Sequence, residues 1–142
     1  MNLGKIKKLI NSIERNPKVL FLIDGIGALV TAFCLGIVLV HFENIFGIPP
    51  SILYVLAVIA IFYAVYDFYS YRQPKAQAAK YLRGIAVLNI MYCLSSLSLA
   101  SYHSEQITIW AWAYLINEII IIVLLSMLEF KIANNYKSIS PH

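Results

Sequence analysis

The chain has few charged residues and few cysteines. Only 13% of its 142 residues are Asp, Glu, Lys or Arg, whereas 61% are hydrophobic. Soluble domains carry about 25% charged and about 45–50% apolar residues, so this composition does not suit a soluble domain. The two cysteines, Cys34 and Cys93, each lie within an apolar run and form no CxxC pair. Their number and placement exclude a disulfide framework and a zinc knuckle, and we expect both thiols to pack as small apolar groups.

Motifs of catalysis and of nucleotide binding are also lacking. The glycines of Gly25–Gly27 lie inside an apolar run, not between a strand and a helix, so they do not predict a phosphate-binding loop. There is no HExxH motif and no nucleophile elbow. The net charge of +4 comes from basic residues beside the apolar runs, where anionic lipid is the natural partner. Nothing in the sequence therefore argues for an enzyme, a cofactor or a nucleic-acid partner.

Four apolar runs are each long enough to cross about 30 Å of hydrocarbon as a helix. They predict an all-α, polytopic membrane protein with a four-helix transmembrane bundle at residues 18–130. Before the bundle, apolar residues recur at helical spacing, which predicts a short amphipathic interfacial helix within residues 1–17, ended by Pro17. After it, residues 131–142 form a polar tail. The predicted spans are about 19–40, 52–69, 81–102 and 107–128.

Lys and Arg are missing from two of the three loops between the spans. All 11 of them lie in the segments 5–18, 72–83 and 131–137, whereas the loops around Glu43 and Glu105 hold none. Cytoplasmic segments of membrane proteins carry the excess of Lys and Arg, so both termini and the middle loop are predicted to be cytoplasmic. An even number of spans, here four, also places both termini on the same side of the membrane. We expect a multi-pass protein of a bacterial-type inner membrane whose basic segments contact the anionic cytoplasmic leaflet.

Polar residues inside the spans form the first candidate site, which comprises Asp24, Asp67, Asn89 and Glu118. At about 1.5 Å per residue, Asp24 and Asn89 lie about 8–12 Å inside the cytoplasmic ends of their helices, and Glu118 lies near the midplane. A charge at such depth costs at least about 2.5–3.5 kcal/mol, and no Lys or Arg lies deep enough to pair with Glu118. A neutral carboxyl bonded to Asn89 or to a tyrosine is the simplest arrangement. The set is either a proton-coupled or cation-binding site or a group of polar staples that fix helix register.

The second candidate site lies at the predicted outer ends of the spans, where His41 precedes Glu43 and His103 precedes Glu105 with the same spacing. Two helical hairpins could bring these four side chains together. Two imidazoles and two carboxylates suit zinc or another divalent ion, and the imidazoles alone suit a pH sensor. We expect ordinary wet interfacial residues instead, and predict no metal, because no dense ligand spacing supports one.

Both halves of the chain are predicted helical hairpins. A shift of 62 residues superposes Lys18 on Lys80, His41 on His103, Glu43 on Glu105, and Asp67 on Glu129. Such a match is typical of a parallel repeat about an axis along the membrane normal. Two unrelated hairpins of this composition would also align in part, so the sequence leaves both interpretations open.

Three short segments carry a family resemblance: FLIDGIGAL at 21–29, YDFY at 66–69 and NIMYC at 89–93. They resemble small four-span bacterial inner-membrane proteins, and the resemblance implies that fold but no activity. We expect a non-enzymatic accessory or scaffold module that acts with another membrane protein. The alternative is a small transporter, proton-coupled or for a lipid-linked substrate, that uses the intramembrane carboxylates. Because four helices enclose little space, the transporter is expected to work as a homo-oligomer.

Overall fold

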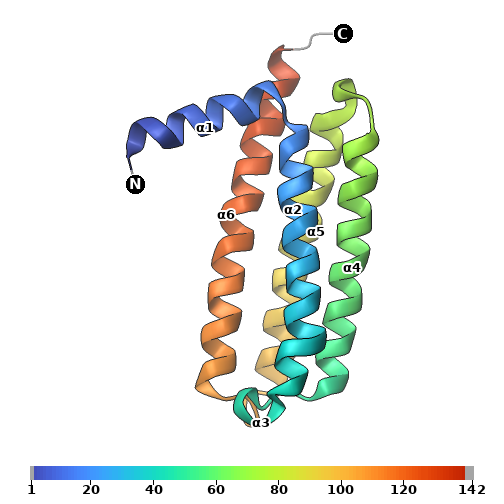
Figure 1. The fold of residues 1–142 in the computed structure, drawn as a ribbon, viewed down its shortest axis with the longest axis vertical. Coiled ribbons are helices and arrows are strands. Elements are labelled where there is room, and N and C mark those ends of the chain that lie inside the picture. The colour runs from blue at the N-terminus through green and yellow to red at the C-terminus, as the bar shows by residue number, and fades with distance from the viewer. Residues whose placement is uncertain (1, 140–142) are drawn as a thin grey trace.

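The computed structural model describes residues 2–139, and helices account for every regular element in this part of the chain. Four helices are long and apolar enough to cross a membrane, and they lie side by side in one bundle (Figure 1). This confirms the predicted all-α architecture with four long apolar helices. Their bounds are Lys18–Leu39 for α2 together with η1, Pro50–Arg72 for α4, Ala78–Tyr102 for α5 and Ile109–Ile139 for α6.

The helix boundaries follow local signals and differ from the predicted spans in two places. Pro50 opens α4, where a missing N–H costs no helical hydrogen bond. The last six residues of the first span, η1 (Cys34–Leu39), are a π-helix, a rare local widening that the sequence did not indicate. The fourth helix continues to Ile139 and so includes most of the segment 131–142 that was assigned to the tail. A short 3₁₀ turn, η2 (Lys75–Gln77), leads into α5.

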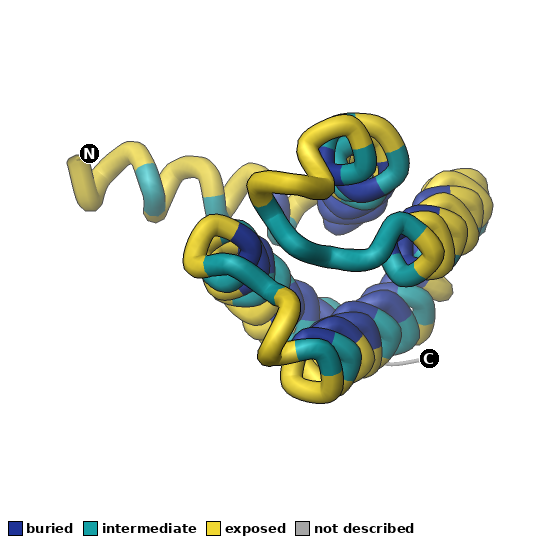
Figure 2. The backbone as a smooth tube through the Cα atoms, turned by 90° about the horizontal axis from the view of Figure 1, so that it is seen from below, coloured by how far each residue is buried: buried dark blue, intermediate teal, exposed yellow. Residues whose placement is uncertain are grey.

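The bundle is built from two tightly packed hairpins. Helix α2 packs along α4, and α5 packs along α6, whereas contacts between the hairpins are sparser. Glycines on α2 and η1 allow the close approach of α4. A Cβ at Gly36 of η1 would lie 3.4 Å from the Ala57 side chain, and one at Gly25 of α2 would lie 3.2 Å from that of Asp67. Seen from below in Figure 2, buried residues line the inner faces of the helices and exposed residues cover the outer faces. The exposed faces carry large apolar side chains such as Ile26, Phe62, Leu94 and Leu124.

Helix α1 (Leu3–Arg15) marks one end of the bundle, which we call the basic end because the Lys- and Arg-containing segments gather there. Ile13 is buried against Leu20, Leu82 and Ile132, and an Asn135 amide donates to the Glu14 carboxylate at 3.2 Å. Beyond these contacts α1 leaves the bundle sideways, as Figure 1 shows. The helix is therefore docked only by its C-terminal turns.

The opposite end, which we call the α3 end, is held by backbone contacts between its two loops. The short helix α3 (Glu43–Phe46) ends at Gly47, whose φ of 70° is left-handed and suits glycine. A Cβ at that position would overlap the carbonyl group of Gln106 from the other loop. Thr108 completes the junction, because its backbone N–H donates to the Phe46 carbonyl at 3.0 Å. The two hairpins are therefore joined at this end by a junction that requires glycine.

Candidate functional site

Each of the four long helices contributes one polar side chain to a cluster in the basic half of the bundle. The four residues, which we call the acid cluster, are Asp24 of α2, Asp67 of α4, Asn89 of α5 and Glu129 of α6. The Asn89 amide donates to Asp24 Oδ2 at 3.0 Å, across the two hairpins. Asp24 also interacts electrostatically with the carboxyls of Asp67 and Glu129. Three acids and one amide thus meet where all four helices converge.

Two of these acids lack the partners that buried carboxyls normally have. Asp67 is 1% exposed and Glu129 is 0% exposed. None of their four carboxyl oxygens has a hydrogen-bond partner within the described part of the chain. The charged groups that act on them are the other acids of the cluster, not Lys or Arg. Since like charges in apolar surroundings strongly oppose one another, the three carboxyls cannot all be ionised together.

Close helix packing keeps this cluster away from solvent. Gly25 brings α2 against α4, where a Cβ on this glycine would lie 3.2 Å from the Asp67 side chain and 3.3 Å from the Phe68 ring. On the other side, Gly84 leaves room for the Tyr66 hydroxyl, which would lie 2.7 Å from a Cβ there. Asp67 is therefore tightly enclosed by the helix contacts, and neither of its carboxyl oxygens has a hydrogen-bond partner among the described residues.

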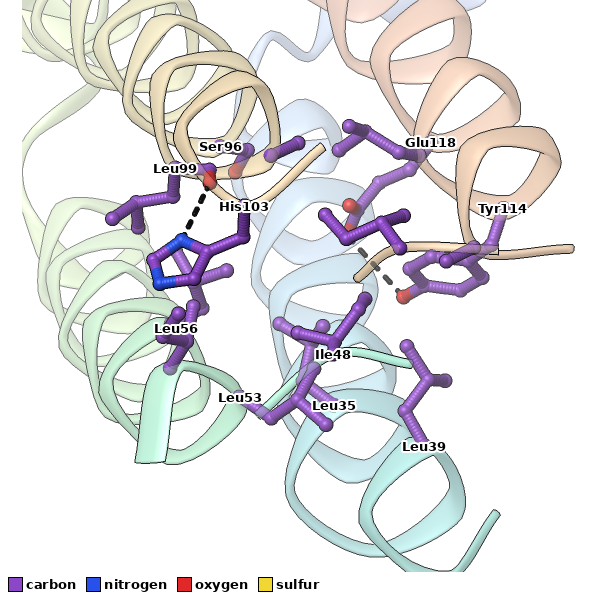
Figure 3. A pocket seen from close by; sticks show the side chains of 15 residues that line it. Leu35, Leu39, Ile48, Leu53, Leu56, Ser96, Leu99, His103, Tyr114 and Glu118 are labelled. Carbon is purple, nitrogen blue, oxygen red and sulfur yellow. Dashed lines mark hydrogen bonds between the residues drawn. The ribbon is translucent and has the colours of Figure 1, made fainter. Parts of the chain in front are cut away.

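Glu118 lies on α6 in a separate polar site toward the middle of the bundle. It is 8% exposed, and the hydroxyls of Tyr92 and Tyr114 both donate to its Oε1 atom at 3.4 Å. Both distances are long for an O–H···O bond, which usually measures about 2.5–3.0 Å. Figure 3 shows the bond from Tyr114 together with the side chains nearby. Unlike Glu129, this carboxylate has donors, but they hold it loosely.

A cavity of about 330 Å³ connects the two polar sites. Asp24 lines it at one end and Glu118 at the other, and all four long helices contribute to its wall. Helices α2 and α6 make only marginal contact with each other in the described chain, so the cavity lies behind an open seam. We call it the α2–α6 cavity. Its remaining polar and aromatic lining consists of Thr31, Tyr63, Asn89, Tyr92, Tyr114 and Asn117.

A second, smaller pocket extends from Glu118 toward the α3 end. It has a volume of about 30 Å³, and its wall is mostly leucine and isoleucine. Ser96 and His103 interrupt that wall (Figure 3), and the buried Ser96 Oγ has no hydrogen-bond partner among residues 2–136. His103 Nδ1 lies 3.0 Å from the Leu99 carbonyl, which can only accept, so Nδ1 is the donor of this bond. The space suits one or two water molecules, at about 10–15 Å³ each.

The structure brings together three of the four predicted site residues and separates the fourth. Asp24, Asp67 and Asn89 meet as one group, whereas Glu118 belongs to the tyrosine site. The α6 acid in the cluster is instead Glu129, 11 residues further along the helix, which corresponds to about 16 Å. Glu129 was not predicted as a site residue, and it lies just beyond the predicted end of the fourth span at about residue 128. One signal did indicate it, since the 62-residue shift superposes Asp67 on Glu129.

The outer residues are not assembled into a ligand set. His41 is exposed and packs edge-on against Phe42, with ring centroids 5.1 Å apart, and Glu43 and Glu105 are exposed. Throughout the described chain, no group of three or more His, Cys, Asp or Glu side chains is placed to hold a metal ion. The same holds for the acid cluster. Both cysteines are free, Cys93 buried and Cys34 half-buried.

No protein family, curated protein or solved structure matches the chain. A functional assignment must therefore come from the acid cluster, the Glu118 site and the two cavities that adjoin them.

Proposed function

We propose that this chain is a small proton-coupled transporter of a bacterial-type inner membrane, with both termini in the cytoplasm. Four helices have the length and apolar composition for spanning, and their outer faces expose large apolar side chains. An exposed apolar surface of that extent needs lipid or protein to cover it. The basic segments gather at the α1 end, which the positive-inside rule assigns to the cytoplasm.

The observation that carries the proposal is the state of Asp67 and Glu129. A fully buried carboxyl without a cation or a hydrogen-bond donor is costly, and stable packing alone would replace it with an apolar residue. Residues that break the rules of folding in this way tend to be functional. Because the cluster provides no other cation to balance its charge, the proton is the ion that fits.

Further polar groups extend from the cluster across the bundle. The α2–α6 cavity joins Asp24 to Glu118, and the smaller pocket joins Glu118 to His103 near the α3 end. Glu118 and Tyr114 line both spaces, so the two cavities meet at this site. Chains of acids, hydroxyls and imidazoles of this kind serve as proton relays in membrane pumps and transporters. This series of groups supports movement of protons along the bundle, beyond their storage at one end.

The proposal is tested by proton flux through the purified full-length protein in liposomes. A potassium diffusion potential drives protons inward, and an entrapped pH-sensitive dye reports their entry. We expect the wild type to acidify the lumen, and we expect Asp67→Asn and Glu129→Gln each to abolish most of that flux. Glu105→Gln is the matched control, because it removes an exposed acid outside the bundle and should leave the rate unchanged.

Flux in the wild type that survives both cluster variants would overturn the role of the acid cluster. Absence of flux in the wild type would overturn the proposed movement of protons through the bundle. Folding is checked for each variant by size-exclusion chromatography and circular dichroism before reconstitution.

A second candidate function is the non-enzymatic accessory or scaffold module. The bond from Asn89 to Asp24 favours it, because an amide–carboxyl pair that links two hairpins is what a polar staple requires. In that case the wild type carries no protons, and the partner is another membrane protein or a second copy of the chain.

Helix α1 suits the anionic lipid surface under either function. Its Leu3 and Leu9 are exposed on the apolar face, while Lys5, Lys7 and Lys8 project from the flanks and the polar face. A helix of this kind lies at the headgroup boundary, with its lysines toward anionic lipid.

A further inference from the structure

The α2–α6 cavity is large enough for more than protons. Its volume of about 330 Å³ lies at the lower end of the range of small-molecule pockets, which is about 300–1,000 Å³. Much of its wall is apolar, from residues such as Ala28, Val30, Ile121 and Leu125. A few polar groups interrupt that wall, as is usual where a site fixes the orientation of a ligand.

The charge of the lining indicates which ligand fits. Two carboxyl groups, of Asp24 and Glu118, face one space, and the described residues around it include no Lys, Arg or His. Three tyrosines complete the wall, namely Tyr63, Tyr92 and Tyr114. The faces of aromatic rings beside a carboxylate attract a cation electrostatically. They also bind the apolar body of a ligand by burying its surface. An anion would meet two acids and no counter-charge.

We propose that the α2–α6 cavity binds a monovalent organic cation with an apolar or aromatic body, with the Glu118 carboxylate as its counter-charge. The inference rests on the proposed function in that it takes the chain to span a bilayer and adds a substrate class to proton transport. Glu118 suits this role because its tyrosine partners bond loosely and to the same oxygen. A cation that enters takes the place of a proton on Glu118, and the proton leaves to solvent.

The cavity also has a route of entry for such a molecule. Helices α2 and α6 scarcely touch, and the exposed residues Gly27, Val30, Asn117 and Ile121 lie along the seam between them. The exposure of these residues shows that the seam faces outward from the bundle. In a bilayer the seam would open to lipid, where amphiphilic cations concentrate.

The test uses benzyltrimethylammonium as the ligand and neopentylbenzene as its neutral isostere, in which a carbon atom replaces the charged nitrogen. Binding of labelled benzyltrimethylammonium to the purified full-length protein in non-ionic detergent should be saturable. Excess unlabelled cation should displace it, and the neutral isostere should not. We expect Glu118→Gln to weaken binding about tenfold or more, because the amide removes the counter-charge.

Gly27→Leu provides a second variant that does not alter charge. A Cβ at Gly27 meets nothing within 4 Å, so a larger side chain is accommodated without a clash and narrows the seam. It should weaken binding while leaving the fold intact. Glu43→Gln, which removes an exposed acid at the α3 end, is the matched control and should bind as the wild type does.

Absence of saturable binding to the wild type would overturn the inference, as would equal displacement by the neutral isostere or undiminished binding by both variants. These outcomes are independent of proton flux in liposomes. Flux without cation binding would refute the ligand and keep the movement of protons, whereas cation binding without flux would keep the site and refute the movement of protons through the bundle.

Discussion

Helix α6 buries two glutamates in surroundings that differ in almost every respect. Glu129 packs among the acids of the cluster, with no hydrogen-bond partner among the described residues. Glu118 accepts two tyrosine hydroxyls and adjoins a cavity of about 330 Å³. Within residues 2–136, Glu129 thus makes no close hydrogen bond, although the Asn89 amide acts on it, and it lines no described cavity, whereas Glu118 has both donors and space.

The difference separates two roles that a buried carboxyl can have. Where a carboxyl has no adjoining space and no close hydrogen bond, a proton is the species that can neutralise it, so Glu129 suits proton binding alone. Where there is space and an aromatic wall, a larger cation can compete with the proton, so Glu118 suits exchange between the two. Competition between a proton and a larger cation for Glu118 is enough to exchange one for the other, and Glu129 adds a second site that suits protons alone.

The largest stability effect is expected at Asn89, which supplies the amide bonded to Asp24. Asn89→Leu should lower the free energy of unfolding by about 1–3 kcal/mol, since it leaves a buried carboxyl without its donor. Thermal unfolding of the purified protein in detergent measures the change. A loss of this size would show that the bond between Asn89 and Asp24, within the acid cluster, stabilises the fold.

Asn117→Leu is the matched control for this variant. The same substitution at an exposed position of α6 should change stability by no more than about 0.5 kcal/mol. An equal loss at Asn117 and Asn89 would contradict the special role of the bond to Asp24.

Methionine in place of the two α6 glutamates should have opposite effects. Met has nearly the length of Glu and no charge. Glu129→Met should raise the free energy of unfolding by about 1–2 kcal/mol, because it removes two buried oxygens that lack partners. Glu118→Met should give no such gain, because it deprives the hydroxyls of Tyr92 and Tyr114 of their acceptor.

The pair of Met variants is compared in one thermal-unfolding series with the wild type. Proton flux in liposomes provides the second readout. The Glu129→Met protein should be more stable than the wild type and should carry no protons, because functional sites commonly reduce stability. If Glu129→Met proved destabilising, the carboxyl would be a structural group and the contrast with Glu118 would fail.

The bundle itself could be predicted because its signals are local. Runs of about 20 apolar residues and the distribution of Lys and Arg are properties of short segments, and the four long helices followed them closely. The π-helical turn at Cys34–Leu39 and the continuation of α6 to Ile139 were missed. The π-helical turn depends on tertiary contacts, which hydropathy does not report. The last part of α6 is polar, and hydropathy does not distinguish a polar helix end from a tail.

The acid cluster could be predicted only in part, because it depends on how far each helix slides along its neighbours. The predicted group included Asp24, Asp67 and Asn89, which the structure brings together. Glu118 was added to them, although its true neighbours are Tyr92 and Tyr114. Hydropathy placed Glu129 at the end of the fourth span. In the structure Ile132 and Ala133 pack into the core, so the part of α6 around Glu129 is buried.

The smallest effects are expected from the two tyrosine hydroxyls at Glu118, and their combination is more informative than either alone. Interhelical hydrogen bonds in membrane proteins contribute about 0.6 kcal/mol on average, and distances of 3.4 Å suggest no more than that here. Tyr92→Phe and Tyr114→Phe should each cost about 0.6 kcal/mol or less, measured by thermal unfolding.

The double variant should cost more than the sum of the two. Both hydroxyls donate to the same atom, Glu118 Oε1, so the first loss leaves one tyrosine donor in place and the second leaves none, with Thr31 as the remaining hydroxyl that acts on the carboxylate. A double-mutant cycle isolates this coupling, which for groups in one network is about 0.5 kcal/mol or more. Simple additivity would mean that the two hydroxyls act independently. Glu118 would then need no donor, and its contrast with Glu129 would rest on the cavity alone.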